Sequence, residues 1–228
     1  MQKVKETITK TCISTDYLLI LDRSGSMDSC WKATIDGLNE QISTIKRLNQ
    51  DNKEQQYTIS LLVFDDEIEW VVFRKKPSKV QKFTGNEFPP RGLTALHDAI
   101  GFGIKKLNKS LKTTTTNSLQ FPVVVIMTDG GENASKEYTI TQINKKINAL
   151  KEKKWSITFI GANQDVLETA KKLGVSKEMA HSFTSDSDGV HIINESLSKS
   201  MCKRAAHIRT ASESEAIIEM DFKLEIEG

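Results

Sequence analysis

The sequence has 228 residues, 38% of them hydrophobic and 27% charged, with a formal net charge of +2 at pH 7. This composition is typical of a globular protein with one substantial core, and the small net charge predicts binding neither to nucleic acid nor to an anionic membrane. Because we find no bilayer-spanning run, no signal-peptide pattern and only three widely spaced cysteines, we expect a cytoplasmic protein without a disulfide framework.

In chain order, the first predicted element is the continuous apolar run at 17–22, which is typical of a strand covered on both faces. Apolar residues at helical spacing follow over 30–49. The runs at 57–64 and 68–73 then predict two strands. The link of three acidic residues between them is of hairpin length, so these two strands should be antiparallel.

The second half of the chain alternates between helical and strand patterns after a loop at 74–94 that is rich in glycine and proline. The elements predicted after this loop are a helix at 95–112, a polar link at 113–120, a strand at 121–129, a helix at 136–153, a strand at 155–162, a short helix at 164–173, an edge strand at 181–184 and a closing helix at 188–206. Strands separated by helices indicate an α/β fold. We predict a Rossmann-like, doubly wound and mostly parallel sheet of about six strands, with one antiparallel edge strand and helices on both faces.

The two ends of the chain do not fit this alternation. Residues 3–13 and 216–226 alternate apolar and polar side chains, so each is a candidate extra strand, and the two could pair beside the main sheet. The open alternative is that both ends lack regular structure. We therefore divide the chain into an N-terminal extension at 1–14, a central domain at 15–206 and a C-terminal tail at 207–228.

Three polar clusters lie where predicted strands end or a predicted helix begins. Asp22, Ser24 and Ser26 follow the first strand, Thr94 stands at the start of the helix at 95–112, and Asp129 ends the strand at 121–129. In an open α/β sheet, ligands bind at the carboxyl ends of the strands, near the point where the strand order reverses. These five oxygen-bearing side chains are therefore candidates for one site.

Each cluster also has a simpler explanation. Ser24, Ser26 or Asp28 could cap the helix that follows, Thr94 could cap the next helix, and Asp129 could be a turn residue. Taken together, however, two carboxylates and three hydroxyls facing one cleft could bind a hard cation such as Mg²⁺, which prefers oxygen ligands in octahedral geometry.

The segment Asp22-Arg23-Ser24-Gly25-Ser26 resembles the DxSxS motif of von Willebrand factor A domains. Thr94 in GLTALHDAI and Asp129 in IMTDGGENAS resemble the two later elements of that family's metal-ion-dependent adhesion site (MIDAS), so the site looks complete. The resemblance covers about residues 15–206. It is closer to stand-alone bacterial and phage members, because the cysteines are not placed to form the end-closing disulfide of many extracellular members.

The resemblance implies a role for each of the five residues. Ser24 and Ser26 would coordinate the cation directly, Thr94 would do so in the ligand-bound state, and Asp22 and Asp129 would act largely through bound waters. The implied cation is Mg²⁺, with Mn²⁺ and Ca²⁺ as the other candidates. Because few anionic oxygens contact it, the cation would remain electrophilic and bind an Asp or Glu of another protein.

The function implied by the resemblance is therefore metal-dependent protein binding without catalysis, and the oligomeric state stays open. One alternative is an assembly component in which the metal only stabilises the fold and the acidic tail at 213–227 docks elsewhere. A less favoured alternative is a metal-dependent hydrolase. An aspartyl nucleophile at Asp22 would need a second carboxylate where Ser24 stands, and we expect His97 to be an exposed first-turn residue rather than a base.

Overall fold

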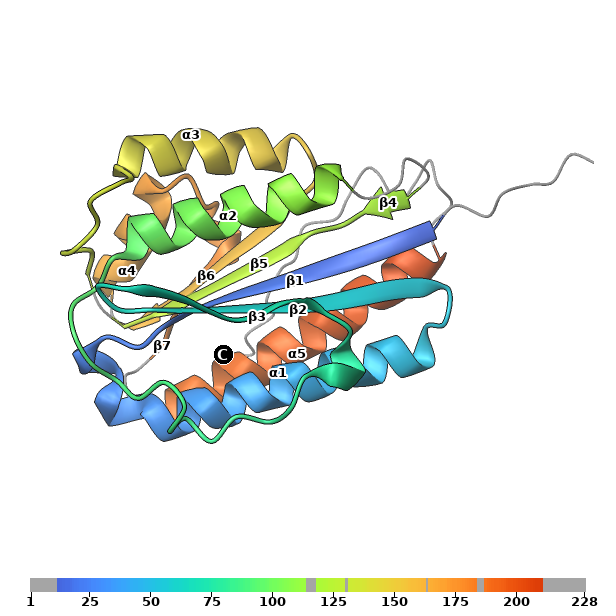
Figure 1. Ribbon diagram of the computed structural model, residues 1–228, viewed down its shortest axis with the longest axis horizontal. Coiled ribbons are helices and arrows are strands. Elements are labelled where there is room, and N and C mark those ends of the chain that lie inside the picture. The colour runs from blue at the N-terminus through green and yellow to red at the C-terminus, as the bar shows by residue number, and fades with distance from the viewer. Residues whose placement is uncertain (1–11, 114–117, 130, 163, 184–186, 211–228) are drawn as a thin grey trace, which may run out of the picture.

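A computed structural model describes residues 12–113, 118–129, 131–162, 164–183 and 187–210 (Figure 1). The strands are β1 Cys12–Asp22, β2 Gln55–Phe64, β3 Ile68–Lys75, β4 Ser118–Gln120, β5 Val123–Thr128, β6 Ser156–Ala162 and β7 Ala180–Phe183. The helices are α1 Trp31–Asp51, α2 Leu96–Lys112, α3 Ile140–Lys151, α4 Gln164–Lys172 and α5 Ser187–Thr210, with short 3₁₀ helices at Gly25–Cys30 (η1), Pro77–Lys79 (η2) and Lys177–Met179 (η3).

The strands form one sheet in the order β3-β2-β1-β5-β6-β7, and the short β4 pairs with the start of β1. All described pairings are parallel except that of β2 with β3. This arrangement confirms the predicted fold class, including the antiparallel edge strand that follows the acidic turn.

The direction of the chain crossovers reverses between β1 and β5. From β1 the chain passes through α1 to β2 on one side, and from β5 it passes through α3 to β6 on the other. Since such crossovers are right-handed, opposite directions place the helices on opposite faces. Accordingly, α1 packs beside α5 on one face, and α2, α3 and α4 cover the other (Figure 1). The crevice that such a reversal opens lies at the carboxyl ends of β1 and β5.

The central strand β1 is covered on both faces. It pairs with β2 from Ile13 to Asp22 and with β5 from Tyr17 to Leu21, and every residue from Ser14 onward is buried. This coverage explains why the sequence of β1 is continuously apolar over its second half rather than alternating.

The largest differences from the predicted strands concern β1 and β4. β1 begins at Cys12 rather than at residue 17, because its polar first residues pair with β2 and with β4. β4 itself lies inside the stretch predicted as a polar link, and three residues are too few to produce a recognisable pattern. Apart from Cys12 and Ile13, which belong to β1, the predicted pairing of 3–13 with 216–226 lies outside the described residues.

The helix predicted at 136–153 begins at Ile140 instead. Thr139 accepts a hydrogen bond from the backbone N–H of Gln142, and the Gln142 side chain accepts one from the backbone of Thr139. This reciprocal pair is a capping box, which satisfies N–H groups that a helix end leaves without partners. It fixes the first turn of α3 at this point.

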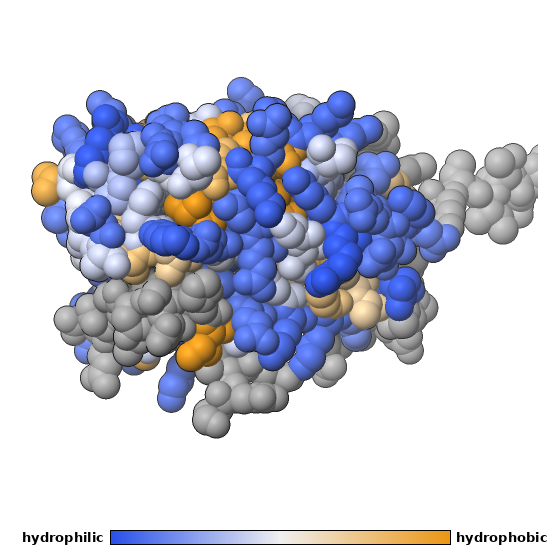
Figure 2. All heavy atoms as spheres, turned by 90° about the horizontal axis from the view of Figure 1, so that it is seen from below, coloured by the Kyte–Doolittle hydropathy of each residue, from blue (hydrophilic) through white to orange (hydrophobic). Residues whose placement is uncertain are grey.

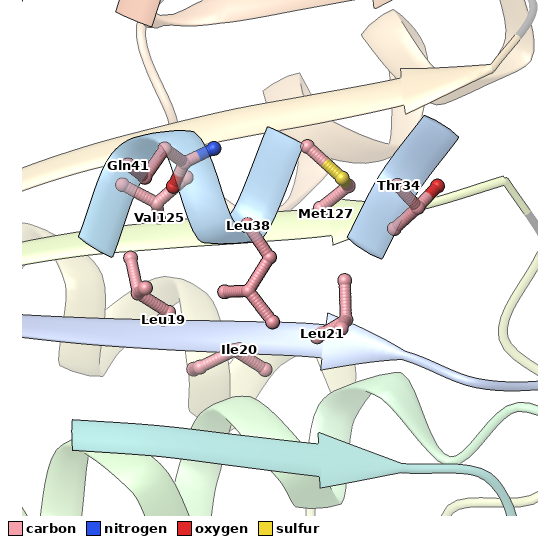
Figure 3. Close-up of a pocket in the computed structure, with 8 residues that line it drawn as sticks. All are labelled: Leu19, Ile20, Leu21, Thr34, Leu38, Gln41, Val125 and Met127. Atoms are coloured by element: carbon pink, nitrogen blue, oxygen red, sulfur yellow. The ribbon is translucent and has the colours of Figure 1, made fainter. Parts of the chain in front are cut away.

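The packing of α1 on α5 depends on one glycine. A Cβ atom on Gly37 would lie only 1.8 Å from Nδ2 of Asn194, so a larger residue here would displace the Asn194 side chain. The Asn194 side chain accepts a hydrogen bond of 2.5 Å from Nε2 of Gln41. Beneath α1, a cavity of about 20 Å³ remains between Leu38 and Gln41 of the helix and the strands β1 and β5 (Figure 3). Such a volume is that of about one water molecule.

The surface is polar over the face formed by α1 and α5, where apolar residues occupy only small separated areas (Figure 2). Among the described residues, Leu93 and Ile192 are the large apolar side chains classed as exposed. None of the helices in the described part of the chain combines the length and apolar character needed to cross a bilayer. Cys12, Cys30 and Cys202 are free thiols.

The edge strand β3 is fastened to the centre of the sheet by a buried ion pair. The carboxylate of Asp16 in β1 is fully buried, and its Oδ1 accepts hydrogen bonds from Thr58 at 2.6 Å and from Nε of Arg74 at 3.0 Å. Arg74 has a positive φ of 44°, which is rare for a residue with a side chain. Its backbone N–H donates to the Ser60 hydroxyl, so strong side-chain contacts hold this unusual conformation.

Replacing Asp16 with Ala should therefore lower the free energy of unfolding by about 2–4 kcal/mol, because the Arg74 guanidinium loses its buried partner. Urea unfolding followed by circular dichroism measures this change. The matched control is Asp36→Ala, which breaks the exposed pair with Lys32 and should cost less than about 0.5 kcal/mol. Equal effects of the two substitutions would contradict the structural role of the Asp16–Arg74 pair.

Candidate metal site

Three loops meet at the carboxyl edge of the sheet, beside the ends of β1 and β5. The backbone N–H of Arg91 donates to the carbonyl of Arg23 at 2.8 Å, and the N–H of Gly25 donates to the carbonyl of Gly92 at 3.3 Å. These bonds join the loop before α2 to the segment that follows β1. The third loop follows β5 and is joined to the first two through Thr94, as described below.

Four of the five predicted site residues are connected by hydrogen bonds. The hydroxyls of Ser24 and Ser26 lie 3.1 Å apart, and the Ser26 hydroxyl donates to Oδ1 of Asp129 at 2.8 Å. Asp22 accepts from the backbone N–H of Ser24 at 2.7 Å and from the Thr128 hydroxyl at 2.5 Å. The ends of β1 and β5 therefore form one group of oxygen atoms.

The fifth residue, Thr94, is placed by its backbone. Its N–H donates to Oδ1 of Asn133 at 2.8 Å, and its carbonyl accepts from the N–H groups of Asn133 and Ala134. The residue is 3% exposed. Its hydroxyl makes no hydrogen bond with any residue in the described ranges, so the structure places Thr94 between the two neighbouring loops without a direct bond to the other four.

The capping roles considered for these residues are wrong. Ser24 precedes η1, but its side chain makes no capping hydrogen bond there, and the residue that precedes α1 is Cys30. The residue that precedes α2 is Ala95 rather than Thr94. The hydroxyls of Ser24 and Thr94 are therefore not used to terminate helices.

The surroundings of Asp22 and Asp129 make it unfavourable for their carboxylates to be ionised. Burial raises the pKa of Asp22 to about 6, against the opposing effect of its hydrogen bonds with Thr128 and Ser24, and nearby Asp129 raises it further. Burial likewise raises the pKa of Asp129, against the effect of its bond with Ser26. In the described part of the chain, no lysine or arginine side chain is paired with either carboxylate. Their environment therefore favours a state in which the negative charge is neutralised.

The spacing of the oxygens fits a small octahedral cation. Adjacent ligands of Mg²⁺, each about 2.1 Å from the ion, lie about 3 Å apart, which agrees with the 3.1 Å between the hydroxyls of Ser24 and Ser26. Ser26 is exposed and Asp129 is partly exposed, so this side of the group is open to solvent. The described residues contain no cluster of three or more His, Cys, Asp or Glu side chains that could bind a metal. An ion here would depend on hydroxyl ligands.

Arg23, within the DxSxS segment, points away from this group into an ion-pair cluster that the sequence analysis did not identify. Nε of Arg23 and Nε of Arg91 both donate to Oδ2 of Asp65, at 3.1 and 2.7 Å. Glu69 and Glu67 pair with the same two arginines. The cluster fixes the turn between β2 and β3 against the loop before α2. The only sign of this ion-pair cluster in the sequence was the acidic run at 65–67. That run does not show which arginines pair with it.

A second group of polar residues, also missed, fastens the loop after β5 to the first turn of α2. The Asp98 carboxylate accepts backbone hydrogen bonds from Lys136, Glu137 and Tyr138. The Glu132 carboxylate accepts from the backbone N–H of His97 at 2.8 Å. These contacts hold the segment that carries Asn133, which in turn positions Thr94.

The same contacts correct the prediction for His97. Its side chain is only 12% exposed, because the segment containing Glu132 covers the first turn of α2. Burial lowers the pKa of His97, partly offset by the nearby carboxylates of Glu132 and Asp98. Its Nδ1 lies 3.5 Å from Glu132, and no hydrogen bond connects the ring to Ser24 or Ser26.

Comparison with known proteins agrees with the fold described above. A family model described as von Willebrand factor type A domain matches residues 16–195. Among solved structures, the pilus adhesin SpaC from Lactobacillus rhamnosus GG is 14% identical with a TM-score of 0.63, and the match covers 89% of this chain and 30% of the adhesin. No protein of curated function matches the sequence.

Two further proteins share the fold, and each has a solved structure that contains a metal. Proximal thread matrix protein 1 from the mussel byssus is 17% identical with a TM-score of 0.57, over 83% of this chain and 46% of its own, and another of its structures has a zinc-occupied MIDAS motif. The manganese-loaded TRAP protein of Plasmodium vivax is 18% identical with a TM-score of 0.50, over 78% of this chain and 72% of its own. This chain thus spans less than half the length of the mussel protein and of the adhesin.

The buried charge of Asp22 leads to a prediction for the metal-free protein. In EDTA at pH 7, Asp22→Asn should raise the free energy of unfolding by about 1–2 kcal/mol, because it removes a buried anion whose pKa is raised by about two units. Urea unfolding measures the change. Asp36→Asn, which alters an exposed carboxylate, should change stability by less than about 0.5 kcal/mol. A clear loss of stability in Asp22→Asn would contradict this account.

Proposed function

This chain belongs to the von Willebrand factor type A domain family, and from that premise we propose that it is a metal-dependent protein-binding module. A divalent cation bound by Ser24, Ser26 and Thr94, with Asp22 and Asp129 acting through waters, would accept a carboxylate from a partner protein. The observation that carries the proposal is the distance of 3.1 Å between the hydroxyls of Ser24 and Ser26, which suits adjacent ligands of Mg²⁺, with Asp129 held beside them by the hydrogen bond that Ser26 donates.

The charge of the site supports the choice of an anionic partner. The two carboxylates would be outnumbered by three neutral hydroxyls, and both Asp22 oxygens already accept hydrogen bonds from the protein. A dication held in this way keeps much of its positive charge, so an additional anionic oxygen would bind it strongly. Because Ser26 and Asp129 face solvent, a side chain from another protein could reach it.

Mg²⁺ is the cation we propose, and Mn²⁺ or Ca²⁺ would use the same oxygens. One related fold has zinc in its MIDAS motif and another is loaded with manganese, which supports a divalent ion for this chain without deciding which one. The spacing favours the smaller ions, since Ca²⁺ binds its ligands at 2.3–2.6 Å and prefers six to eight of them.

The hydrolase alternative receives less support from the geometry. A serine nucleophile needs a neighbouring base that can remove its proton. Here the described contacts of the two serine hydroxyls are with each other and with the carboxylate of Asp129, whose negative charge our proposal assigns to the ion, and the ring of His97 faces Glu132 instead of a serine. We therefore propose binding rather than catalysis for this site.

The first test is thermal unfolding with Mg²⁺ and with EDTA. At a Mg²⁺ concentration 100 times its dissociation constant, the ion should add about 2.7 kcal/mol to stability, which corresponds to a rise in Tm of roughly 5–10 °C. Ser24→Ala should abolish this rise because it removes a direct ligand. Ser29→Ala, an exposed serine five residues further along, should retain it. An equal rise in all three proteins would contradict a metal site at Ser24.

The second test separates partner binding from stabilisation of the fold. Partners captured from lysate on the immobilised protein should be lost in EDTA and in Ser24→Ala. Thr94→Ala should reduce capture more than it reduces the Mg²⁺-dependent rise in Tm, because the family resemblance implies that Thr94 coordinates the ion directly only when a ligand is bound. Capture that is insensitive to metal, combined with metal-dependent melting, would instead favour a purely structural ion.

A further inference from the structure

A groove of about 580 Å³ lies between the edge strand β3 and the helix α2. We call it the β3–α2 groove, and the side chains that define it are Ile68, Trp70, Phe102, Lys105, Lys106 and Lys109. β3 is the terminal strand of the sheet, so no described strand covers its outer side. The three apolar side chains are partly exposed, and the three lysines are exposed. The groove therefore combines an apolar floor with a positively charged wall.

The lysines of this wall are not equivalent. Nζ of Lys106 lies 4.3 Å from the ring centroid of Trp70 and 4.5 Å from that of Phe73, so its charge is held over two aromatic faces. Among the described residues, Lys105 and Lys109 form no ion pair. They are four residues apart, on the same face of α2. Two ammonium groups are therefore available to an anionic ligand beside the aromatic floor.

The two acidic residues in the groove do not cancel this charge pattern. The Asp98 carboxylate is 6% exposed and accepts three backbone hydrogen bonds from the loop after β5. Asp66 accepts the backbone N–H of Leu93 at 3.3 Å. Both acids lie at the end of the groove nearest the metal site, since Leu93 is the chain neighbour of Thr94.

The groove is thus continuous with the rim of the candidate metal site. Leu93, at 54% exposure, is one of two exposed large apolar side chains in the described part of the chain, and it stands between Thr94 and the Asp66 end of the groove. From Asp98 to Lys109 the helix rises about 16 Å, which is the length of about five residues of extended chain. A segment bound at the metal could continue over Leu93 into this groove.

We propose that the β3–α2 groove binds an acidic, apolar-containing segment of the same partner protein that supplies the carboxylate to the metal. Apolar side chains of that segment lie against Trp70 and Phe102, and its carboxylates lie beside Lys105 and Lys109. This inference rests on the proposed function, and it specifies the partner as a protein with several acidic residues in an extended stretch.

A nucleic acid is disfavoured as the occupant. Phosphates would also bind the lysines, but single strands gain much of their affinity by stacking bases on open aromatic faces. In the groove, Lys106 already lies over the ring faces of Trp70 and Phe73, so a base could not stack flat on those faces, whereas an apolar side chain needs only the edge of Trp70. The test therefore also measures the affinity of an oligonucleotide, which should be weaker than that of the acidic peptide.

The test uses the full chain and a fluorescent eleven-residue peptide in which glutamate alternates with leucine, with affinity measured by fluorescence anisotropy in EDTA. Lys105→Glu/Lys109→Glu should weaken binding at least tenfold. The control Lys145→Glu/Lys171→Glu makes the same charge change at exposed positions of α3 and α4, and it should bind as the wild type does. Circular dichroism confirms that both variants are folded.

Three results would overturn the proposal. These are equal affinity in the groove variant, equal weakening in the control variant, and equal or tighter binding of a peptide alternating lysine with leucine or of a ten-residue oligothymidylate. Trp70→Leu gives an independent check, because it should weaken binding without changing the charge.

The same assay can contradict the proposed metal site and the proposed groove independently of each other. Adding Mg²⁺ should tighten peptide binding in the wild type, and Ser24→Ala should lose this gain while keeping its affinity in EDTA. Loss of the Mg²⁺ effect alone would overturn the metal-dependent function but not the groove. A Mg²⁺-dependent gain in the wild type, combined with unchanged affinity of Lys105→Glu/Lys109→Glu in EDTA, would overturn the groove alone.

Discussion

The hydrogen bond from Thr128 to Asp22 joins the ends of β1 and β5 at the point where the crossover direction reverses. The rest of the candidate site depends on this junction. It brings Asp129 within 2.8 Å of Ser26, and the loop after β5 then positions Thr94 through Asn133. Two strands that are about a hundred residues apart in the chain thus contribute to one group of oxygens because parallel neighbours end at the same edge of the sheet.

The charged groups around the site have partners of their own, whereas no cationic side chain among the described residues balances the negative charge of the site itself. Arg23 lies within the DxSxS segment, yet its guanidinium is paired with Asp65 and Glu69 instead of with Asp22. Asp98 and Glu132 are saturated by backbone N–H groups. In the described part of the chain, Asp22 and Asp129 form no ion pair, and burial raises the pKa of both. A divalent cation would remove the cost of this buried charge, and so folding and ion binding are expected to be coupled.

The surface around the site suggests how a carboxylate-binding centre gains selectivity. A single contact between a carboxylate and a metal does not distinguish one partner protein from another, because every protein exposes aspartate and glutamate. Additional contacts in the β3–α2 groove would distinguish partners by sequence, and Leu93 connects the two regions. The ion-pair cluster of Asp65 with Arg23 and Arg91 keeps the turn before β3 in a fixed position between them. Recognition would then be divided between a strong, unspecific ionic contact and a weaker, specific groove.

The sequence by itself determined the order of strands and helices, the antiparallel edge strand and the residue types of the site, because these follow from periodicity, link length and short motifs. It could not place β4, the first residue of α3 or the burial of His97, since each depends on contacts with distant segments such as those of Asp98 and Glu132. Only the tertiary structure decided that Ser24 and Thr94 do not cap helices and that the Ser26 hydroxyl lies about 3 Å from both the Ser24 hydroxyl and the Asp129 carboxylate. The reason is physical: a motif specifies which groups are available, whereas strand pairing across the sheet sets the distances between them.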